Sequence, residues 1–266
     1  MKRHTTVGRL FLFVFAACAA LVAGCGRDLD VGSDILWTSR FEGGNFDEWK
    51  NVPSPPSPNA IEVSSDVSRQ PGNYSAKLTV SGTANNTQGL GASLVRDGNA
   101  PTEAYYSAWY YLPQSISVGL YWVIMKFRYH NPSDPTTGAE LFDVNLTSQK
   151  SGVMSLRVYD HNAGSDGGSG HDLPLLNTVK EQPKLSVGKD WFQIEVFYRN
   201  AADGRFTLWL DGQEIMDTRE STGLDGWLAW DVVSVGYNLS PEPAVLYVDD
   251  CAISRTRIGP TGLLAE

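Results

Sequence analysis

The chain has 266 residues, of which 42% are hydrophobic and 11% aromatic, and its formal net charge is −9. That length allows one large all-β domain or two small ones. A chain this acidic lacks the basic surface that nucleic-acid binding requires, and its charge does not draw it to an anionic membrane. We therefore expect no nucleic-acid partner.

Residues 1–24 are predicted to be a removed export signal. Three basic residues, Lys2, Arg3 and Arg9, precede an apolar run from Leu10 to Val22. A basic start, a short apolar run and small residues before the cut are typical of a secretory signal. The run is shorter than the about 20 residues that a membrane-spanning helix needs. Loss of the three cations leaves the mature chain more acidic still, at −12.

The end of this segment, Val22-Ala23-Gly24-Cys25, resembles the lipobox of bacterial lipoproteins. The resemblance implies that Cys25 is lipidated and becomes the mature N-terminus, followed by a linker over residues 25–33. The protein would then be exported and would touch a membrane through its lipid anchor only. Gly26 resembles the outer-membrane sorting signal of hosts with two membranes. An ordinary signal with an accidental cysteine is the alternative.

The rest of the chain has the pattern of strands joined by turns. Its 26 glycines and many aromatic residues favour strands, and Asp-Gly between apolar runs is typical of a hairpin, as predicted for Asn200–Gly204. One short helix is expected, at Leu175–Leu185. About eleven strands without intervening helices predict a sandwich of two antiparallel sheets. The expected strands are Leu36–Phe41, Ser75–Ser81, Ala92–Arg96, Tyr105–Leu112, Tyr121–His130, Leu141–Thr147, Met154–Asp160, Trp191–Arg199, Arg205–Asp211, Val232–Tyr237 and Val245–Ile253.

The order of several segments resembles a known superfamily over nearly the whole mature chain. The segments are Phe41–Gly44 with Trp49, Tyr105–Leu112, Gly188–Trp191, Phe206–Gly212 and Leu246–Asp250. Together they resemble the concanavalin A-like lectin/glucanase jelly rolls and, more narrowly, the heparin-lyase-type polysaccharide lyases. Those lyases often carry Gln and His two residues apart in a Trp-led strand. Here that strand, Trp122–His130, is basic and shifted, so no catalytic residue is carried over by position.

The resemblance implies one all-β jelly-roll domain over residues 34–258, with a short tail at 259–266. In many related jelly rolls a Glu after the first Phe and an Asp of the closing strand share a structural calcium. Glu42 and Asp249 match those positions. Calcium takes six to eight oxygen ligands, which two carboxylates and loop carbonyls could supply. The alternative is an exposed Glu and an Asp pair beside a turn, without a metal.

Alternation along the strands predicts a polar face. Residues two apart share a face of a strand, which groups cations, amides, a tyrosine and two histidines. These are Lys126, Arg128 and His130; Asp143 and Asn145; Arg157, Tyr159 and His161; and Gln193 and Glu195. Such a set is what a groove for an acidic sugar would require. The alternative is the solvated face of a sandwich, which is also polar.

This face contains the residue types that β-elimination from a uronic acid needs. One group must neutralise the C6 carboxylate, one must remove the C5 proton and one must protonate the leaving oxygen. The candidate catalytic residues are Arg128, His130, Asn145, Arg157, Tyr159 and His161, with Lys126, Asp143, Gln193 and Glu195 as ligand contacts. Trp227 and Trp230 are candidates for stacking on sugar, or else cap the edge of the sandwich.

The sequence does not support glycoside hydrolysis. Glu140-Leu141-Phe142-Asp143-Val144-Asn145 is superficially similar to the Glu-x-Asp-x-x-Glu signature of hydrolases with this fold. Glu140 and Asp143 are an odd number of residues apart, so a regular strand would turn them to opposite faces. The remaining hypotheses are an exported lyase for an acidic polysaccharide and a non-catalytic module that binds carbohydrate or the cell surface.

Overall fold

The computed structural model describes residues 34–69, 72–83, 90–131, 134–149, 152–161, 170–176, 179, 183–219 and 226–262. Residues 31–266 form one compact unit. The export signal, the lipidated Cys25 and most of the linker lie outside the described residues, so they stay predictions. Within the described ranges, the chain contains no helix long and apolar enough to cross a membrane.

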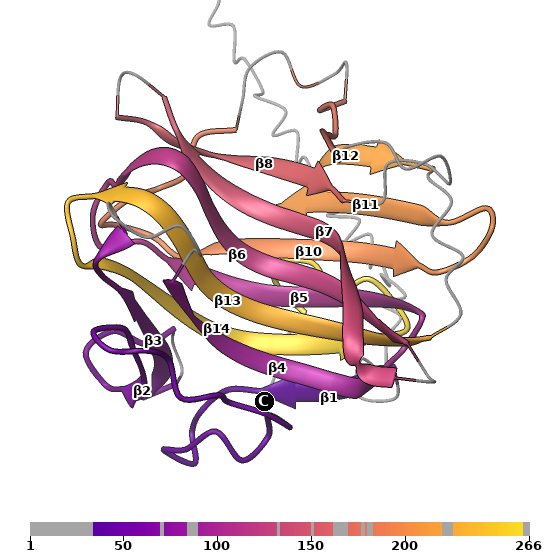
Figure 1. The fold of residues 1–266 in the computed structure, drawn as a ribbon, viewed down its shortest axis with the longest axis horizontal. Helices are drawn as coiled ribbons and strands as arrows, with labels where there is room; N and C mark the ends of the chain where they lie inside the picture. Colours follow the sequence, from indigo (N-terminus) through magenta and orange to yellow (C-terminus); the bar gives the residue numbers. More distant parts are fainter. Residues whose placement is uncertain are drawn as a thin grey trace, which may run out of the picture. The chain divides into compact units, whose positions relative to one another are not determined.

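One sheet has eight strands in the order β12-β11-β10-β5-β14-β3-β2, with β1 also paired to β14 (Figure 1). All its pairings are antiparallel. The strands are β1 (Ile35–Ser39), β2 (Ala60–Ser64), β3 (Ser75–Val80), β5 (Glu103–Tyr111), β10 (Phe192–Arg199), β11 (Arg205–Leu210), β12 (Gln213–Thr218) and β14 (Ala244–Ser254).

The second sheet has six strands in the order β4-β13-β6-β7-β8-β9, again all antiparallel. Its strands are β4 (Leu90–Ala100), β6 (Ser117–Asn131), β7 (Asp134–Ser148), β8 (Met154–Asp160), β9 (His171–Asp172) and β13 (Trp227–Ser240). The described residues thus form the predicted all-β jelly-roll sandwich of two antiparallel sheets.

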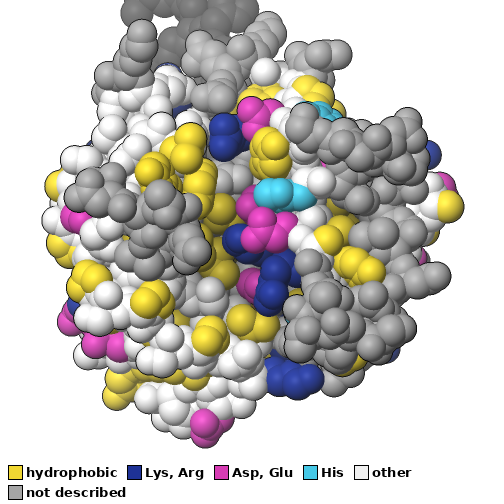
Figure 2. Space-filling model, viewed as in Figure 1, with side chains coloured by type: hydrophobic (Ala, Val, Ile, Leu, Met, Phe, Trp, Pro, Cys, Tyr) yellow, Lys and Arg dark blue, Asp and Glu magenta, His cyan; other side chains and the backbone are white. Residues whose placement is uncertain are grey.

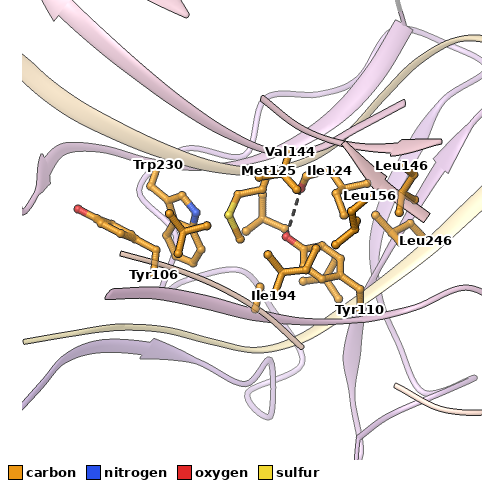
Figure 3. Packing of buried hydrophobic residues seen from close by; sticks show 14 of the residues in the cluster. Tyr106, Tyr110, Ile124, Met125, Val144, Leu146, Leu156, Ile194, Trp230 and Leu246 are labelled. Atoms are coloured by element: carbon orange, nitrogen blue, oxygen red, sulfur yellow. Dashed lines mark hydrogen bonds between the residues drawn. The ribbon is translucent and has the colours of Figure 1, made fainter. Parts of the chain in front are cut away.

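Aromatic side chains between the sheets hold them together (Figure 3). Tyr106 of β5 packs edge-on against Phe127 of β6, with ring centroids 5.1 Å apart, and lies 5.4 Å from Trp230 of β13. The hydroxyl of Tyr110 donates a hydrogen bond of 3.3 Å to the carbonyl of Ile124, so one sheet is also bonded to the backbone of the other. Trp230 is fully buried in this core. Its predicted role in stacking on sugar is therefore wrong.

The structure contains the predicted hairpin at Asn200–Gly204 but not the predicted helix at Leu175–Leu185. Gly204 donates to the carbonyl of Ala201 in the predicted turn between β10 and β11. The expected helix is wrong, because the described residues of that segment are irregular. Their backbone amides bond to strands instead: Leu176 donates to Ile215 and Leu185 to Met154. Packing against strand edges has replaced the internal hydrogen bonds of a helix.

Candidate functional site

The face of the six-stranded sheet that points away from the core, here called the groove face, is shaped by two β-bulges. The register of β6 against β7 shifts between Val123 and Met125, since Ile124 and Met125 both pack in the core. Val123 consequently joins Lys126 on the groove face, whereas strict alternation had placed it on the opposite side.

The second shift lies opposite Phe127 and Arg128, where β7 carries one extra residue, Leu141. Leu141 and Phe142 are both buried in the core. Glu140 therefore faces the same side as Asp143, and the expectation that these carboxylates point to opposite faces is wrong. The regular period of a strand fails at a bulge.

The register of four strands arranges the groove face in three rows that cross β8, β7, β6 and β13 in turn. The first row is Arg157, Asn145, Val123 and Val235, and the second is Tyr159, Asp143, Lys126 and Asp231. The third is Glu140, Arg128 and Ala229, with His161, which directly follows β8, 3.6 Å from Glu140. Side chains directly opposite on paired strands lie close enough to interact. Charged residues of both signs thus come together in the second and third rows.

These rows line a cavity of about 550 Å³. Its polar wall is formed by Lys126, Glu140, Asp143, Asn145, Arg157, Tyr159 and His161, and its apolar wall by Leu120, Tyr121, Val123 and Val235. Figure 2 shows this hollowed face, where acidic, basic and histidine side chains follow one another beside hydrophobic ones. Six residues selected from the sequence meet here, together with Glu140 and Tyr121, which had not been selected. Glu140 was missed because sequence alternation does not reveal a bulge.

Each of the four cations in these rows lies beside a carboxylate. Lys126 Nζ donates to Glu140 and Arg128 Nε to Asp231. His161 Nε2 lies 2.9 Å from Asp143 Oδ2, and Arg157 Nε lies 3.3 Å from Asp172 Oδ1 on β9. The formal charges of these four pairs cancel when His161 is protonated. The face is therefore charge-balanced rather than a basic stripe.

The pKa of His161 is raised above its ordinary value by opposing causes. Burial lowers it, but the hydrogen bond to Asp143 and the charges of Asp143 and Glu140 outweigh burial. For Glu140, burial raises the pKa, yet Lys126, His161 and Arg128 together bring it below its usual range. Glu140 is thus ionised at neutral pH, and His161 holds its proton more tightly than a free imidazole does.

Tyr159 and Asn145 are fixed by the backbone around the cavity. The Tyr159 hydroxyl donates a hydrogen bond of 2.7 Å to the carbonyl of Gly170, and its ring lies 4.8 Å from that of His161. Asn145 Nδ2 donates to the carbonyl of Asp143 at 3.1 Å, with the side chain buried. A hydroxyl, an amide and an imidazole therefore line the part of the cavity formed by β7 and β8.

The ligand atoms of Glu140, Asp143 and His161 lie within 4.8 Å of one another, which is close enough to share a metal ion. The chain's own cations already fill that role. Lys126 binds Glu140 and lies 4.0 Å from Asp143, while His161 binds Asp143. A metal would have to displace the ammonium group and the imidazole proton, so these residues fit an ion-pair cluster better than a metal site.

The remaining residues predicted on this face lie away from the cavity. Arg128 belongs to the third row, just beyond the lining residues. His130 and Trp227 are opposite each other further along β6 and β13, with ring centroids 6.3 Å apart, and Trp227 is exposed. They stay candidates for contacts with a longer ligand.

Gln193 and Glu195 were placed on this face wrongly. Both lie on β10 in the other sheet, fully buried. Gln193 Nε2 donates to Ser107 and to the carbonyl of Gly259, and Glu195 accepts hydrogen bonds from the backbone amides of Ile258 and Gly259. They anchor the end of the chain. Alternation correctly places Gln193 and Glu195 on the face of β10 that points away from the core, but it does not show that β10 belongs to the eight-stranded sheet.

Glu42 and Asp249, the predicted calcium ligands, line one small cavity together with Arg69 and Asp250. Their oxygens already have partners: Glu42 accepts from the amide of Asn73, and Asp249 from the amides of Arg69 and Asp250. The pKa of Asp249 is raised to about 7, chiefly by burial and also by the nearby carboxylates, although backbone hydrogen bonds oppose this. Calcium at this cavity stays a prediction.

No protein-family model matches the chain, and no curated protein matches it. Solved structures do. An endo-β-1,4-glucuronan lyase from the fungus Trichoderma reesei superposes with a TM-score of 0.61 at 15% identity, over 84% of this chain and 96% of that one. The cellulose-induced protein Cip1 gives 0.57 at 17% identity, over 84% and 98%. The alginate lyase vAL-1 from a Chlorella virus gives 0.55 at 14% identity, over 84% and 100%. The chain therefore shares its fold with polysaccharide lyases.

Proposed function

We propose that the protein is a lyase that cleaves a uronate-containing polysaccharide by β-elimination in the groove-face cavity. The observation that carries the proposal is the meeting of Asn145, Arg157, Tyr159 and His161 at one cavity. The likeness of the fold to glucuronan and alginate lyases supports it. Fold alone does not establish an activity, so the argument rests on the chemistry of these four side chains.

Arg157 and Asn145 would bind the C6 carboxylate of the sugar. They are opposite each other on β8 and β7, and a guanidinium with an amide can take the two carboxylate oxygens separately. The apolar side of the same cavity, with Val123 and Val235, gives the sugar ring a surface to lie on. Neutralising the carboxylate lowers the pKa of the C5 proton, which is the difficult part of the reaction.

His161 would remove the C5 proton, because its Nε2 is engaged with Asp143 and its Nδ1 is the ring atom left to accept. The electron pair of the C5–H bond then forms the C4–C5 double bond as the C4–O bond breaks. Tyr159 would give its hydroxyl proton to the leaving oxygen, turning from the carbonyl of Gly170. Asp143 stabilises the imidazolium that forms, as a buried carboxylate beside a catalytic histidine does.

Hydrolysis is less well supported, although Glu140 and Asp143 now share a face with ligand atoms within 4.8 Å. A retaining glycosidase places two carboxyl groups about 5–5.5 Å apart, but one of them must be a protonated acid with a raised pKa. The pKa of Glu140 is lowered instead, since Lys126, His161 and Arg128 outweigh the effect of burial. Lys126 and His161 also bind these carboxylates.

The test is to incubate the purified protein with glucuronan and with alginate and to follow the ultraviolet absorbance of the new double bond. Arg157→Ala should lower kcat/KM by about 10- to 150-fold, the value of a charge-assisted contact. Arg205→Ala is the matched control, because Arg205 is equally exposed and pairs with Asp217 at 2.7 Å, but on the other sheet.

Three results would contradict the proposal in different ways. Binding of either polymer without a double bond would favour the non-catalytic carbohydrate-binding module. New reducing ends without absorbance would favour hydrolysis. An equal loss of kcat/KM in Arg157→Ala and Arg205→Ala would show that the reaction does not take place in this cavity.

We further propose, from the sequence pattern alone, that the protein is exported and lipid-anchored at Cys25. Cys25→Ser should move the protein from the membrane fraction to the soluble fraction of the cells that export it. Unchanged fractionation would refute the anchor.

A further inference from the structure

We infer that Asp172 is a specificity-determining residue that holds Arg157 until the carboxylate of a substrate takes its place. The inference rests on the proposed function, in which Arg157 binds the sugar carboxylate. Asp172 lies on β9, the last strand of the six-stranded sheet, opposite Tyr159 of β8. It thus borders the end of the cavity at which the sugar carboxylate would bind.

Of the four cations in the rows of the groove face, Arg157 is held most loosely by its nearest carboxylate, Asp172. Each of the other three cations hydrogen-bonds to its carboxylate. Arg157 Nε lies 3.3 Å from Asp172 Oδ1 and makes no hydrogen bond within the described part of the chain. The Asp172 side chain is 54% exposed, against 42% for Glu140, 7% for Asp143 and 4% for Asp231. Its carboxylate is therefore the one most easily exchanged.

The backbone beside Asp172 is nevertheless held in place. Leu173 is buried, and its amide donates a hydrogen bond of 2.9 Å to the carbonyl of Val158. On the other side, the carbonyl of Gly170 accepts the hydroxyl of Tyr159 at 2.7 Å. A Cβ at Gly170 would lie 2.6 Å from Cε1 of Tyr159, so this close approach requires glycine. The chain thus keeps an exposed carboxylate at a fixed place beside Arg157.

A bound uronate has to compete with this carboxylate for the same guanidinium. Two carboxylates at one arginine repel each other, so binding of the sugar proceeds by exchange rather than by simple addition. An exposed ion pair of this kind contributes only a small free energy, which corresponds to about a two- to fivefold change in affinity. Asp172 would accordingly lower the affinity of the site for any anion that Arg157 alone holds. An anion that also contacts Asn145 would overcome this competition.

The experiment compares Asp172→Asn with the wild-type protein on glucuronan. The variant should lower KM about two- to fivefold, with the change in KM and not in kcat, and Asp172→Glu should restore the wild-type KM. Asp217→Asn is the matched control, because it removes the partner of Arg205 on the opposite sheet and should change neither constant.

An unchanged or increased KM in Asp172→Asn would overturn the inference, since Asp172 would then be neutral or would help to position Arg157. The two proposals fail separately. If Arg157→Ala lowers kcat/KM as expected while Asp172→Asn leaves KM unchanged, only the inference falls. If wild-type protein neither binds nor cleaves glucuronan or alginate, the proposed function falls, and the inference with it.

Discussion

Trp230 and Trp227 are three residues apart on β13, but Trp230 lies in the core and Trp227 on the surface. Trp230 is fully buried, with ring neighbours Trp37, Trp49 and Tyr106 at centroid distances of 6.0, 5.9 and 5.4 Å. Trp230→Ala should lower the free energy of unfolding by about 3–5 kcal/mol. In a domain of this size that corresponds to a fall in melting temperature of about 6–20 °C. Trp227→Ala should cost only about 1 kcal/mol, because Trp227 is 36% exposed and its ring contact is with His130.

Chemical unfolding followed by fluorescence measures both effects, and glucuronan affinity is measured on each variant below its melting temperature. We expect Trp230→Ala to lose stability and keep its affinity, and Trp227→Ala to keep its stability and lose affinity for long polymers. Equal destabilisation by the two substitutions would refute the assignment of Trp230 to the core. A loss of glucuronan affinity in Trp230→Ala but not in Trp227→Ala would show that Trp230 contacts the polymer.

Three further outcomes follow from buried ionisable groups. The folded state binds the proton of Asp249 more tightly than the unfolded state does, because the pKa of Asp249 is raised to about 7. The contribution of Asp249 to stability is therefore fully present below pH 3.8 and is lost, by up to about 4 kcal/mol, as the pH rises through 7. In a chelating buffer, Asp249→Asn should abolish that slope in urea unfolding measured across this range. Turnover should rise with pH as His161 loses its proton and the neutral imidazole forms. Asp143→Asn should shift this rise to lower pH, because Asp143 raises the pKa of His161. Glu195→Ala should lower unfolding free energy by about 2–3 kcal/mol, since it leaves buried amides unpaired, without changing glucuronan affinity.

The sequence predicted the fold well because its strongest signals are local. Runs of alternating apolar residues identify strands, and Asp-Gly marks a hairpin whether or not its partners are known. Asp211 and Gly212, for example, both adopt the positive φ values of 48° and 79° that a tight hairpin between β11 and β12 requires. Three short strands, β2, β9 and β12, were not predicted. β12 is an edge strand whose residues do not alternate. The helix at Leu175–Leu185 was wrongly predicted because backbone amides of this segment donate hydrogen bonds to residues remote in sequence, which local patterns do not reveal.

The site was less predictable because it depends on register and on bulges. Residue types and period-two spacing were enough to select Asn145 and Arg157, which lie on strands that pair directly, and His161, which directly follows one of them. The same reasoning applied to Glu195 failed, because alternation does not say which sheet a strand joins. Glu140 was lost for a third reason: a single extra residue, Leu141, reverses the phase of the strand. Pairing between strands remote in sequence decides which sheet a strand joins and where a bulge lies. A single sequence does not reveal that pairing.

The electrostatics of the groove face limit how an acidic polymer could bind to an acidic protein. A chain with a net charge of −9 repels a polyuronate at long range, and its groove cations are matched by carboxylates. At physiological ionic strength, charges beyond about 8 Å are largely screened, so this repulsion weakens and binding is decided by contacts inside the cavity. There, each bound carboxylate must replace a protein carboxylate at its cation. Affinity therefore depends on the geometry of exchange at Arg157 and Asn145 and not on electrostatic attraction, and association should be slower than for a basic groove.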